Sequence, residues 1–369
     1  MLAVGAAGLV LGCVLLGLQF ARLGLDQTAP FFVGTSWRLD EDLAARDIRV
    51  RLHHGHGYDG QWFLGLAYDP LLREHLAAGF DMPRYRAGRP LQAMTGWLLA
   101  GGRRDAIPLS LLAVGPLALA LGCAASGRLL AAHARSRWWG LGFALVPGVV
   151  VGVTFATAEP LGLALAVLGL SLALDGRTLE AGLGFAGAGL TKESYLVFAA
   201  AAALWLLLRP GGSGRVRVAS AAAVLGPGVL ALGLWWAYVA RMVAASPADL
   251  NAAAALGPPL AGWAHALGLV AAGDYVADAP VGPLGPVFLA GSLALTAAGI
   301  VTGLRRSSLV ARAGLLLGLY GLVLSGELLS RFLSSMRALA PTVLATGLAV
   351  AVALGASTRS RQPVEAANP

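Results

Sequence analysis

Long apolar runs fill most of the chain after residue 105, and they constrain its fold more than any other feature. A helix needs roughly 20 apolar residues to cross a bilayer, and runs close to that length recur. The chain of 369 residues is 57% hydrophobic and only 12% charged, about half the charged fraction of an ordinary soluble domain. The sequence therefore predicts an all-α integral membrane protein, a polytopic helix bundle.

We predict ten transmembrane helices. The first is read as a retained helix because it lacks a basic leading segment and a clean cleavage site; removal as a signal peptide is the alternative. The fifth and sixth are short, so one irregular hairpin that crosses only partly is a second reading of that region. The ten ranges are about 2–21, 106–127, 138–155, 159–174, 179–191, 194–208, 218–240, 281–303, 309–325 and 337–355.

The segment 90–101 is apolar but too short to span, and a basic run with Arg84, Arg86 and Arg89 precedes it. Such a segment is typical of a helix that lies in the membrane interface. We therefore leave it out of the count of spans.

The distribution of basic residues predicts the orientation, because cytoplasmic loops carry an excess of Lys and Arg. With the N-terminus in the cytoplasm, the inner loops hold twelve basic residues and the short outer loops hold four. The inner residues are Arg128, Arg135, Arg137, Arg177, Arg209, Arg215, Arg217, Arg305, Arg306, Arg312, Arg359 and Arg361. The outer residues are Lys192, Arg241, Arg331 and Arg337.

This topology divides the chain into six parts. They are a first transmembrane helix (1–21), an extracytoplasmic loop with juxtamembrane helices (22–105), a transmembrane core (106–240), an outer loop (241–280), C-terminal transmembrane helices (281–355) and a cytoplasmic tail (356–369). The loop around Pro258 and Trp263 is expected to act as an interfacial lid over a substrate groove, because long loops in compact domains tend to be functional.

Polar residues gather in the first long loop, between His53 and Pro70. Near-helical spacing of apolar residues from Tyr58 to Leu72 predicts an amphipathic helix that lies against the bilayer, with Trp62 and Phe63 at headgroup depth. Asp59 falls at the start of this helix. It could simply cap the helix or form a turn, or it could take part in a site at the membrane surface.

Six short segments carry a resemblance to a known family: 58–64 (YDGQWFL), 67–70 (AYDP), 85–91 (YRAGRPL), 138–139 (WW), 157–161 (TAEPL) and 190–194 (LTKES). Their order and spacing resemble the motifs of a bacterial family of polytopic proteins annotated for cell-surface glycopolymer formation. The layout is similar to the GPI mannosyltransferase II group of the GT-C glycosyltransferase superfamily. Lys192 stands where the family often has Arg, which keeps the charge but loses the bidentate geometry.

The resemblance implies a GT-C bundle in the bacterial cytoplasmic membrane, with its site facing outside. It implies a polyprenyl-phosphate-linked or polyprenyl-pyrophosphate-linked sugar donor, a glycan or lipid-linked acceptor, and contact with membrane lipids. Asp59 is the expected general base. The expected substrate-binding residues are Tyr58, Gln61, Asp69, Arg86, Arg89, Glu159, Lys192, Glu193, Arg331 and Arg337.

Other readings stay open. Glu193 could pair with Lys192, Glu159 could only cap its helix, and Glu327 could pair with Arg331. His53, His54 and His56 are weak candidates for a divalent metal site, so no cofactor is expected with certainty. The basic balance orients loops in this class and does not predict nucleic-acid binding. A transporter or flippase of a lipid-linked glycan and a non-catalytic partner of a glycan synthase are the alternative functions.

Overall fold

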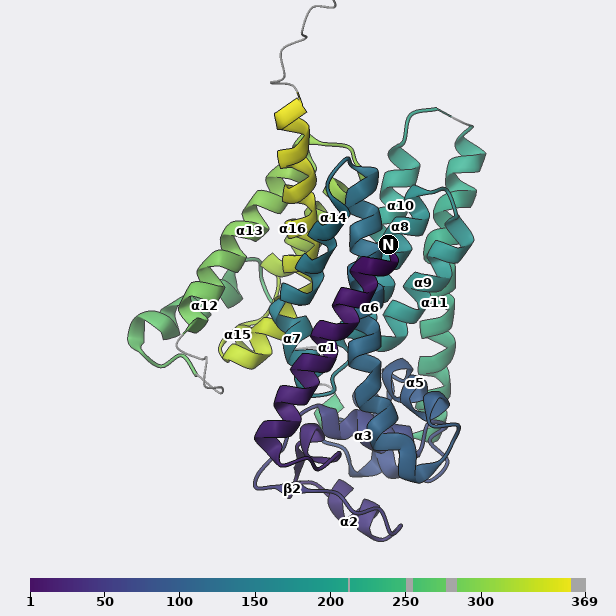
Figure 1. The fold of residues 1–369 in the computed structure, drawn as a ribbon, viewed down its shortest axis with the longest axis vertical. Helices are drawn as coiled ribbons and strands as arrows, with labels where there is room; N and C mark the ends of the chain where they lie inside the picture. Colours follow the sequence, from purple (N-terminus) through teal and green to yellow (C-terminus); the bar gives the residue numbers. More distant parts are fainter. Residues whose placement is uncertain (212, 250–254, 277–283, 360–369) are drawn as a thin grey trace, which may run out of the picture.

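The structure, a computed structural model, describes residues 1–211, 213–249, 255–276 and 284–359. It is mostly helical, at 76%, and the N-terminal helix runs toward the end of the molecule where the first long loop is folded (Figure 1). Elements of the N-terminal part are α1 (Leu2–Leu23), η1 (Ala29–Phe31), β1 (Val33–Gly34), α2 (Leu39–Ala44), β2 (Leu52–His53), α3 (Gly60–Tyr68), η2 (Leu76–Gly79), α4 (Pro83–Ala87), α5 (Leu91–Leu99), η3 (Arg104–Ala106) and α6 (Ile107–Ala132).

The remaining elements are all helical. They are η4 (Arg137–Leu145), α7 (Pro147–Thr154), α8 (Glu159–Leu174), α9 (Thr178–Thr191), η5 (Glu193–Tyr195), α10 (Leu196–Leu208), α11 (Gly214–Met242), α12 (Ala261–Ala272), α13 (Gly285–Arg305), α14 (Leu309–Leu322), α15 (Gly326–Leu329) and α16 (Phe332–Arg359).

The apolar helices fit a multi-pass membrane protein. Within the described residues, five helical segments are long and apolar enough to cross a bilayer, and a bent pair makes a sixth if it counts as one span. That pair, η4 and α7, bends by 63°, where Pro147 begins the second helix. Helices α8 and α14, and the segment from Glu193 to Leu208, are apolar but shorter. The described parts of the ten predicted ranges lie mostly on helices, but the number of spans is not established.

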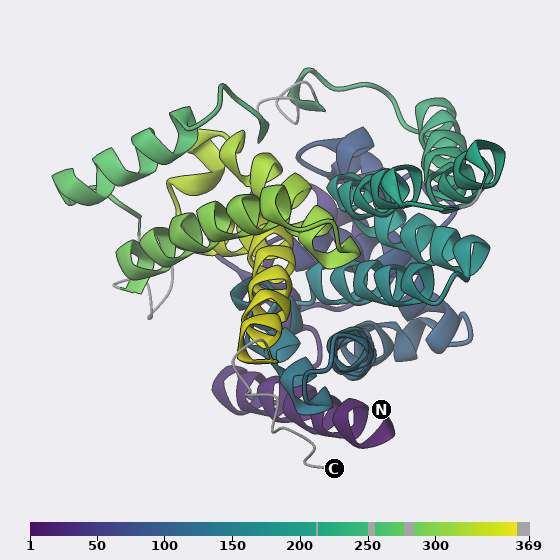
Figure 2. The same ribbon diagram turned by 90° about the horizontal axis from the view of Figure 1, so that it is seen from above.

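Two groups of helices make up the bundle. Helix α6 packs against α1 and α8, and α9 packs between α8 and α11. Helices α13, α14 and α16 pack against one another and join the first group through α10 and α7. Seen from above, the teal helices lie to one side and the green and yellow helices to the other (Figure 2).

The first loop is a compact unit with its own core, which corrects the prediction of a membrane-lying helix. All nine residues of α3 are buried, and Trp62 and Phe63 are only 3% and 6% exposed. Trp62 packs against Phe80 and Trp37 of the same loop. The apolar spacing was real, but the apolar face contacts protein and not lipid.

Two other predictions of local structure have different outcomes. The segment 90–101 forms α5, a helix of nine residues that packs on α6 and α3 and is too short to span. The expected outer loop is wrong for residues 261–272, which form helix α12; its role as a lid stays a prediction. Trp263 of α12 is buried and donates a hydrogen bond to the carbonyl oxygen of Gly321 at 2.8 Å. The rest of that outer segment lies partly outside the described residues.

Candidate functional site

Two glycines allow close backbone approaches around the start of α3. Gly57 has a φ of +68°, a conformation that favours glycine. A Cβ on Gly60 would lie 2.4 Å from the carbonyl oxygen of Phe155, just after α7. Tyr58 and Asp59 stand between these close approaches, so the backbone fixes where both side chains begin.

Asp59 occupies the N-cap position of α3 but makes no side-chain capping bond. Its Oδ2 atom lies 2.7 Å from Nη1 of Arg337 and 3.0 Å from Nη1 of Arg86. The Asp59 side chain is 23% exposed, and both arginine side chains are 13% exposed. The capping interpretation is therefore wrong, and a partly buried carboxylate is shared between two guanidinium groups.

Glu159 begins α8 and is only 1% exposed. Its Oε1 atom accepts a hydrogen bond from Nε of Arg337 at 3.0 Å and lies 3.5 Å from Nζ of Lys192. The hydroxyl of Thr157 donates to the other oxygen of Glu159. Arg337 therefore joins two carboxylates, Asp59 and Glu159, that are a hundred residues apart in the chain.

A second set of ion pairs borders the first. Arg89 binds Glu193 through two donors, at 2.9 Å and 2.6 Å, and also donates to the hydroxyl of Tyr85. Arg86 binds Asp81 in the same bidentate way, at 2.9 Å for each bond. Pairing of Glu193 with Lys192 is thus wrong, because Lys192 turns to Glu159.

These side chains line a cavity of about 260 Å³ between the first loop and the bundle. Among its described lining residues, four are cations and two are carboxylates. Two further carboxylates outside this lining, Asp81 and Glu159, pair with three of the cations and balance the charge of the cluster. The lining residues are Tyr58, Asp59, Met82, Tyr85, Arg86, Arg89, Lys192, Glu193, Ser194, Ala255, Tyr320, Leu328, Ser334, Arg337 and Ala338. We call this space the ion-pair cavity.

Electrostatic interactions keep Asp59 and Arg86 of this cavity ionised. Burial raises the pKa of Asp59, but Arg86 and Arg337 lower it by more, so the carboxyl titrates below its ordinary range. Burial lowers the pKa of Arg86, while Asp59 and Asp81 raise it by more. Burial also raises the pKa of Tyr58 to about 12, so its phenol stays neutral at pH 7.

Three of the predicted site residues take no part in the ion pairs described above. The buried side chain of Gln61 accepts from the backbone N–H of Gly34 and donates to the carbonyl oxygen of His56, which ties the loop together. Asp69 is buried and accepts from two backbone N–H groups after α3. Arg331 is exposed, pairs its backbone with Val276, and does not line the ion-pair cavity.

The three histidines do not form a metal site with neighbouring carboxylates or thiols. In the described ranges, no group of three or more His, Cys, Asp or Glu side chains is placed to hold a metal ion. His53 stacks on Phe32 with ring centres 4.3 Å apart. His53, His54 and His56 instead line a second and larger pocket.

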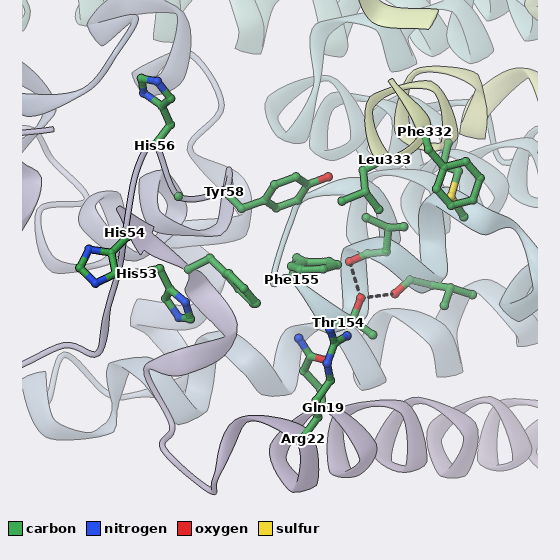
Figure 3. A pocket seen from close by; sticks show the side chains of 15 residues that line it. Gln19, Arg22, His53, His54, His56, Tyr58, Thr154, Phe155, Phe332 and Leu333 are labelled. Atoms are coloured by element: carbon green, nitrogen blue, oxygen red, sulfur yellow. Dashed lines mark hydrogen bonds between the residues drawn. The ribbon is translucent and has the colours of Figure 1, made fainter. Parts of the chain in front are cut away.

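This second pocket has a volume of about 700 Å³ and is shown in Figure 3. We call it the histidine pocket. Tyr58 lines both spaces, so its side chain stands between the histidine pocket and the ion-pair cavity. Sequence reasoning missed the pocket, although Gln19 and Arg22 gave a signal as polar residues in the last turns of an apolar helix.

Sequence reasoning also missed several residues of the ion-pair cavity. Tyr85 lies in a motif that was noticed, but no role was assigned to it. Asp81 precedes the same motif and pairs with Arg86 from outside the cavity lining. Tyr320 lies in an apolar helix far along the chain, where no local pattern marks it.

The fold and the cavity together define a mostly helical protein of multi-pass membrane type with a polar, ion-paired site beside its first long loop. Comparisons with models of known protein families, with curated proteins and with solved structures found no match.

The arrangement suits a small anionic group. Four cations from three separate parts of the chain face one cavity, and arginine binds phosphate through paired donors. A volume of about 260 Å³ is below the roughly 300–1,000 Å³ of sites that enclose a drug-sized ligand. The cavity is therefore large enough for a small anionic group such as a phosphate but too small for a whole lipid, and Asp59 and Glu193 are the carboxylates of its described lining.

Proposed function

We propose that the protein is a membrane glycosyltransferase, similar to the GT-C superfamily, that transfers a sugar from a polyprenyl-phosphate or polyprenyl-pyrophosphate donor to a cell-surface glycan or lipid-linked acceptor. The observation that carries the proposal is the sharing of Asp59 between Arg86 and Arg337 at the edge of a cavity lined by two further cations. The motif resemblance in the first half of the chain supports the same class. In this proposal the cavity faces the outside of a bacterial cytoplasmic membrane.

The chemical step needs a base and a set of cations. The acceptor hydroxyl attacks the anomeric carbon of the donor sugar, and Asp59 takes the hydroxyl proton. A new carbon–oxygen bond forms as the bond from the sugar to the lipid phosphate breaks. The lipid phosphate leaves with the electron pair, and Arg86, Arg89, Lys192 and Arg337 meet its charge.

In this proposal the ion pairs of the cavity also account for how a strongly paired carboxylate becomes a base. While Arg86 and Arg337 bind Asp59, the pKa of this carboxyl is low and the group is a poor proton acceptor. Phosphate oxygens of the donor compete for the same guanidinium groups. When those groups turn to the phosphate, the pKa of Asp59 rises, so donor binding prepares the base.

The test is sugar transfer by the purified full chain in lipid nanodiscs, with a synthetic polyprenyl-phosphate sugar as donor. We expect Asp59→Asn to lower turnover by about 10²–10⁴-fold, the usual contribution of a general base. Asp105→Asn is the matched control, since Asp105 is exposed and pairs only with the exposed Arg103. Equal turnover in wild type and Asp59→Asn would refute the assignment of Asp59, and no turnover in wild type with a range of donor sugars would refute the proposed class.

A further inference from the structure

The histidine pocket combines an apolar wall with a polar end. Its apolar wall comes from α7 and α16, with Val150, Val151, Phe155, Leu333 and Met336, and α1 closes another side. Helices α1 and α16 are candidate membrane spans, and α7 is half of the bent pair. The histidines of the first loop lie at one side of the space and Phe332 and Leu333 at the other (Figure 3).

Three buried polar atoms of residues that line this pocket have no hydrogen-bond partner within the described part of the chain: Nε2 of Gln19, Nε2 of His53 and the hydroxyl of Tyr58. Tyr58 also lines the ion-pair cavity, so Gln19 and His53 are the two that belong to this pocket alone. Gln19 is only 6% exposed. A buried polar group without a partner costs about 1–3 kcal/mol, so such groups mark places where a ligand or water completes the bonding. Thr154 differs, because its hydroxyl already donates to backbone carbonyls of α7.

The chemistry of the Gln19 and His53 atoms indicates which ligand group could hydrogen-bond to them. The amide nitrogen of Gln19 can only donate. Nε2 of His53 donates in one neutral tautomer and accepts in the other, and a hydroxyl satisfies either because it both donates and accepts. Burial lowers the pKa of His53, which favours the neutral ring.

The charge of the pocket separates it from the ion-pair cavity. Among its described lining residues, Arg22 is the one Lys or Arg side chain, and it is exposed. The ion-pair cavity, in contrast, has four such cations. A lipid phosphate therefore belongs in the ion-pair cavity, and an uncharged, hydroxyl-bearing head belongs in the histidine pocket.

We propose that the histidine pocket binds a membrane amphiphile with a hydroxyl-bearing head, whose tail lies along α7 and α16 and whose head bonds Gln19 and His53. A volume of about 700 Å³ is within the range that encloses a drug-sized ligand. That this amphiphile is the acceptor rests on the proposed function and on Tyr58, which lines both this pocket and the cavity at which Asp59 lies.

The test uses photolabelling and needs no turnover. The probe is an alkyl glucoside with a diazirine in its tail, added to the full chain in nanodiscs, and labelled peptides are mapped by mass spectrometry. We expect labels on the pocket residues of α7 and α16. Gln19→Met keeps the shape but loses one hydrogen bond, so it should weaken labelling about three- to tenfold. A trimethylammonium probe with the same tail cannot form that bond, so it should label wild type and Gln19→Met equally.

Two further variants test occupancy. Val151→Trp fills the pocket and should abolish the labels on α16, whereas Val287→Trp, on an exposed face of α13, should leave them unchanged. Labels spread over all helices, or labels unchanged by both Gln19→Met and Val151→Trp, would overturn the site.

The same experiment separates this inference from the proposed function. Asp59→Asn should be labelled like wild type, because Asp59 does not line the histidine pocket. If wild type transfers sugar from the donor but binds no glucoside in the pocket, the inference fails alone. If the pocket is labelled and no donor sugar is ever transferred, the proposed function fails and the amphiphile site stands.

Discussion

Replacement of Arg337 with methionine should destabilise the fold, because Arg337 neutralises two carboxylates at once. Asp59 would keep Arg86 at 3.0 Å, and Glu159 would keep Lys192 at 3.5 Å together with Thr157. Removal of one partner from a buried ion pair costs about 3–5 kcal/mol. Since each carboxylate retains one cation, we take the lower figure of about 3 kcal/mol.

The assay is the thermal unfolding midpoint of purified Arg337→Met in nanodiscs. At roughly 2 °C per kcal/mol for a chain of this size, the midpoint should fall by about 6 °C. Glu159→Gln added to Arg337→Met removes the charge that the first change leaves unpaired. The loss in free energy of unfolding should therefore be smaller in the double variant than the sum of the losses in the two single variants, by about 0.5–3 kcal/mol.

Arg331→Met is the matched control, since Arg331 is exposed and lies six residues before Arg337 outside the ion-pair cavity. An unchanged midpoint in Arg337→Met would refute the reasoning. Strict additivity of Arg337→Met and Glu159→Gln would also refute it, because the two side chains would then not interact.

Three further predictions concern pH, packing and ion-pair geometry. Burial alone would raise the pKa of Asp59, but Arg86 and Arg337 hold it below its ordinary value of about 3.9. The stability of the fold should therefore fall as the pH decreases below about 4. An equally steep dependence of stability on pH in Asp59→Asn would contradict this. A Cβ on Gly162 would lie 2.1 Å from Oγ1 of Thr191. Gly162→Ala should therefore lower the free energy of unfolding by about 1–3 kcal/mol, as measured by thermal unfolding. Gly233→Ala is the control, since Gly233 has open space around it, and this change should be neutral or stabilising. Arg89→Lys loses the bidentate bond to Glu193 and should weaken donor binding more than it lowers the maximal rate; an unchanged KM would count against it.

Hydrophobicity predicted where the helices lie, because lipid and protein interiors both select apolar side chains. For the same reason it could not tell which helices span. The spacing of Trp62 and Phe63 predicted a helix with an apolar face, but that pattern is the same whether the face meets lipid or the core of a folded loop. Coordinates were needed to place α3 inside that core.

The charged residues that line the ion-pair cavity were all among the expected site residues, but their partners were not foreseen. A charged residue at the end of a span is expensive enough to stand out, which pointed to Glu159 and Glu193, whereas Lys192 and Arg337 were expected as cations on the same side of the membrane. Local sequence favoured pairing between adjacent Lys192 and Glu193, but neighbouring side chains point in different directions. The actual partners come from distant segments, and short-range patterns carry no information about them.

The contact between Asp59 and Arg337 spans 278 positions in the chain, and this has a consequence for biogenesis. The carboxylate emerges early in translation, whereas its guanidinium partner arrives 278 positions later, on α16. In a nascent chain released before α16 is made, Asp59 has Arg86 but not Arg337 as a partner, and the ion-pair cavity is incomplete. The ion-pair cavity would therefore be complete only after α16 has been made, and truncations that remove α16 should lack it however well their earlier helices insert.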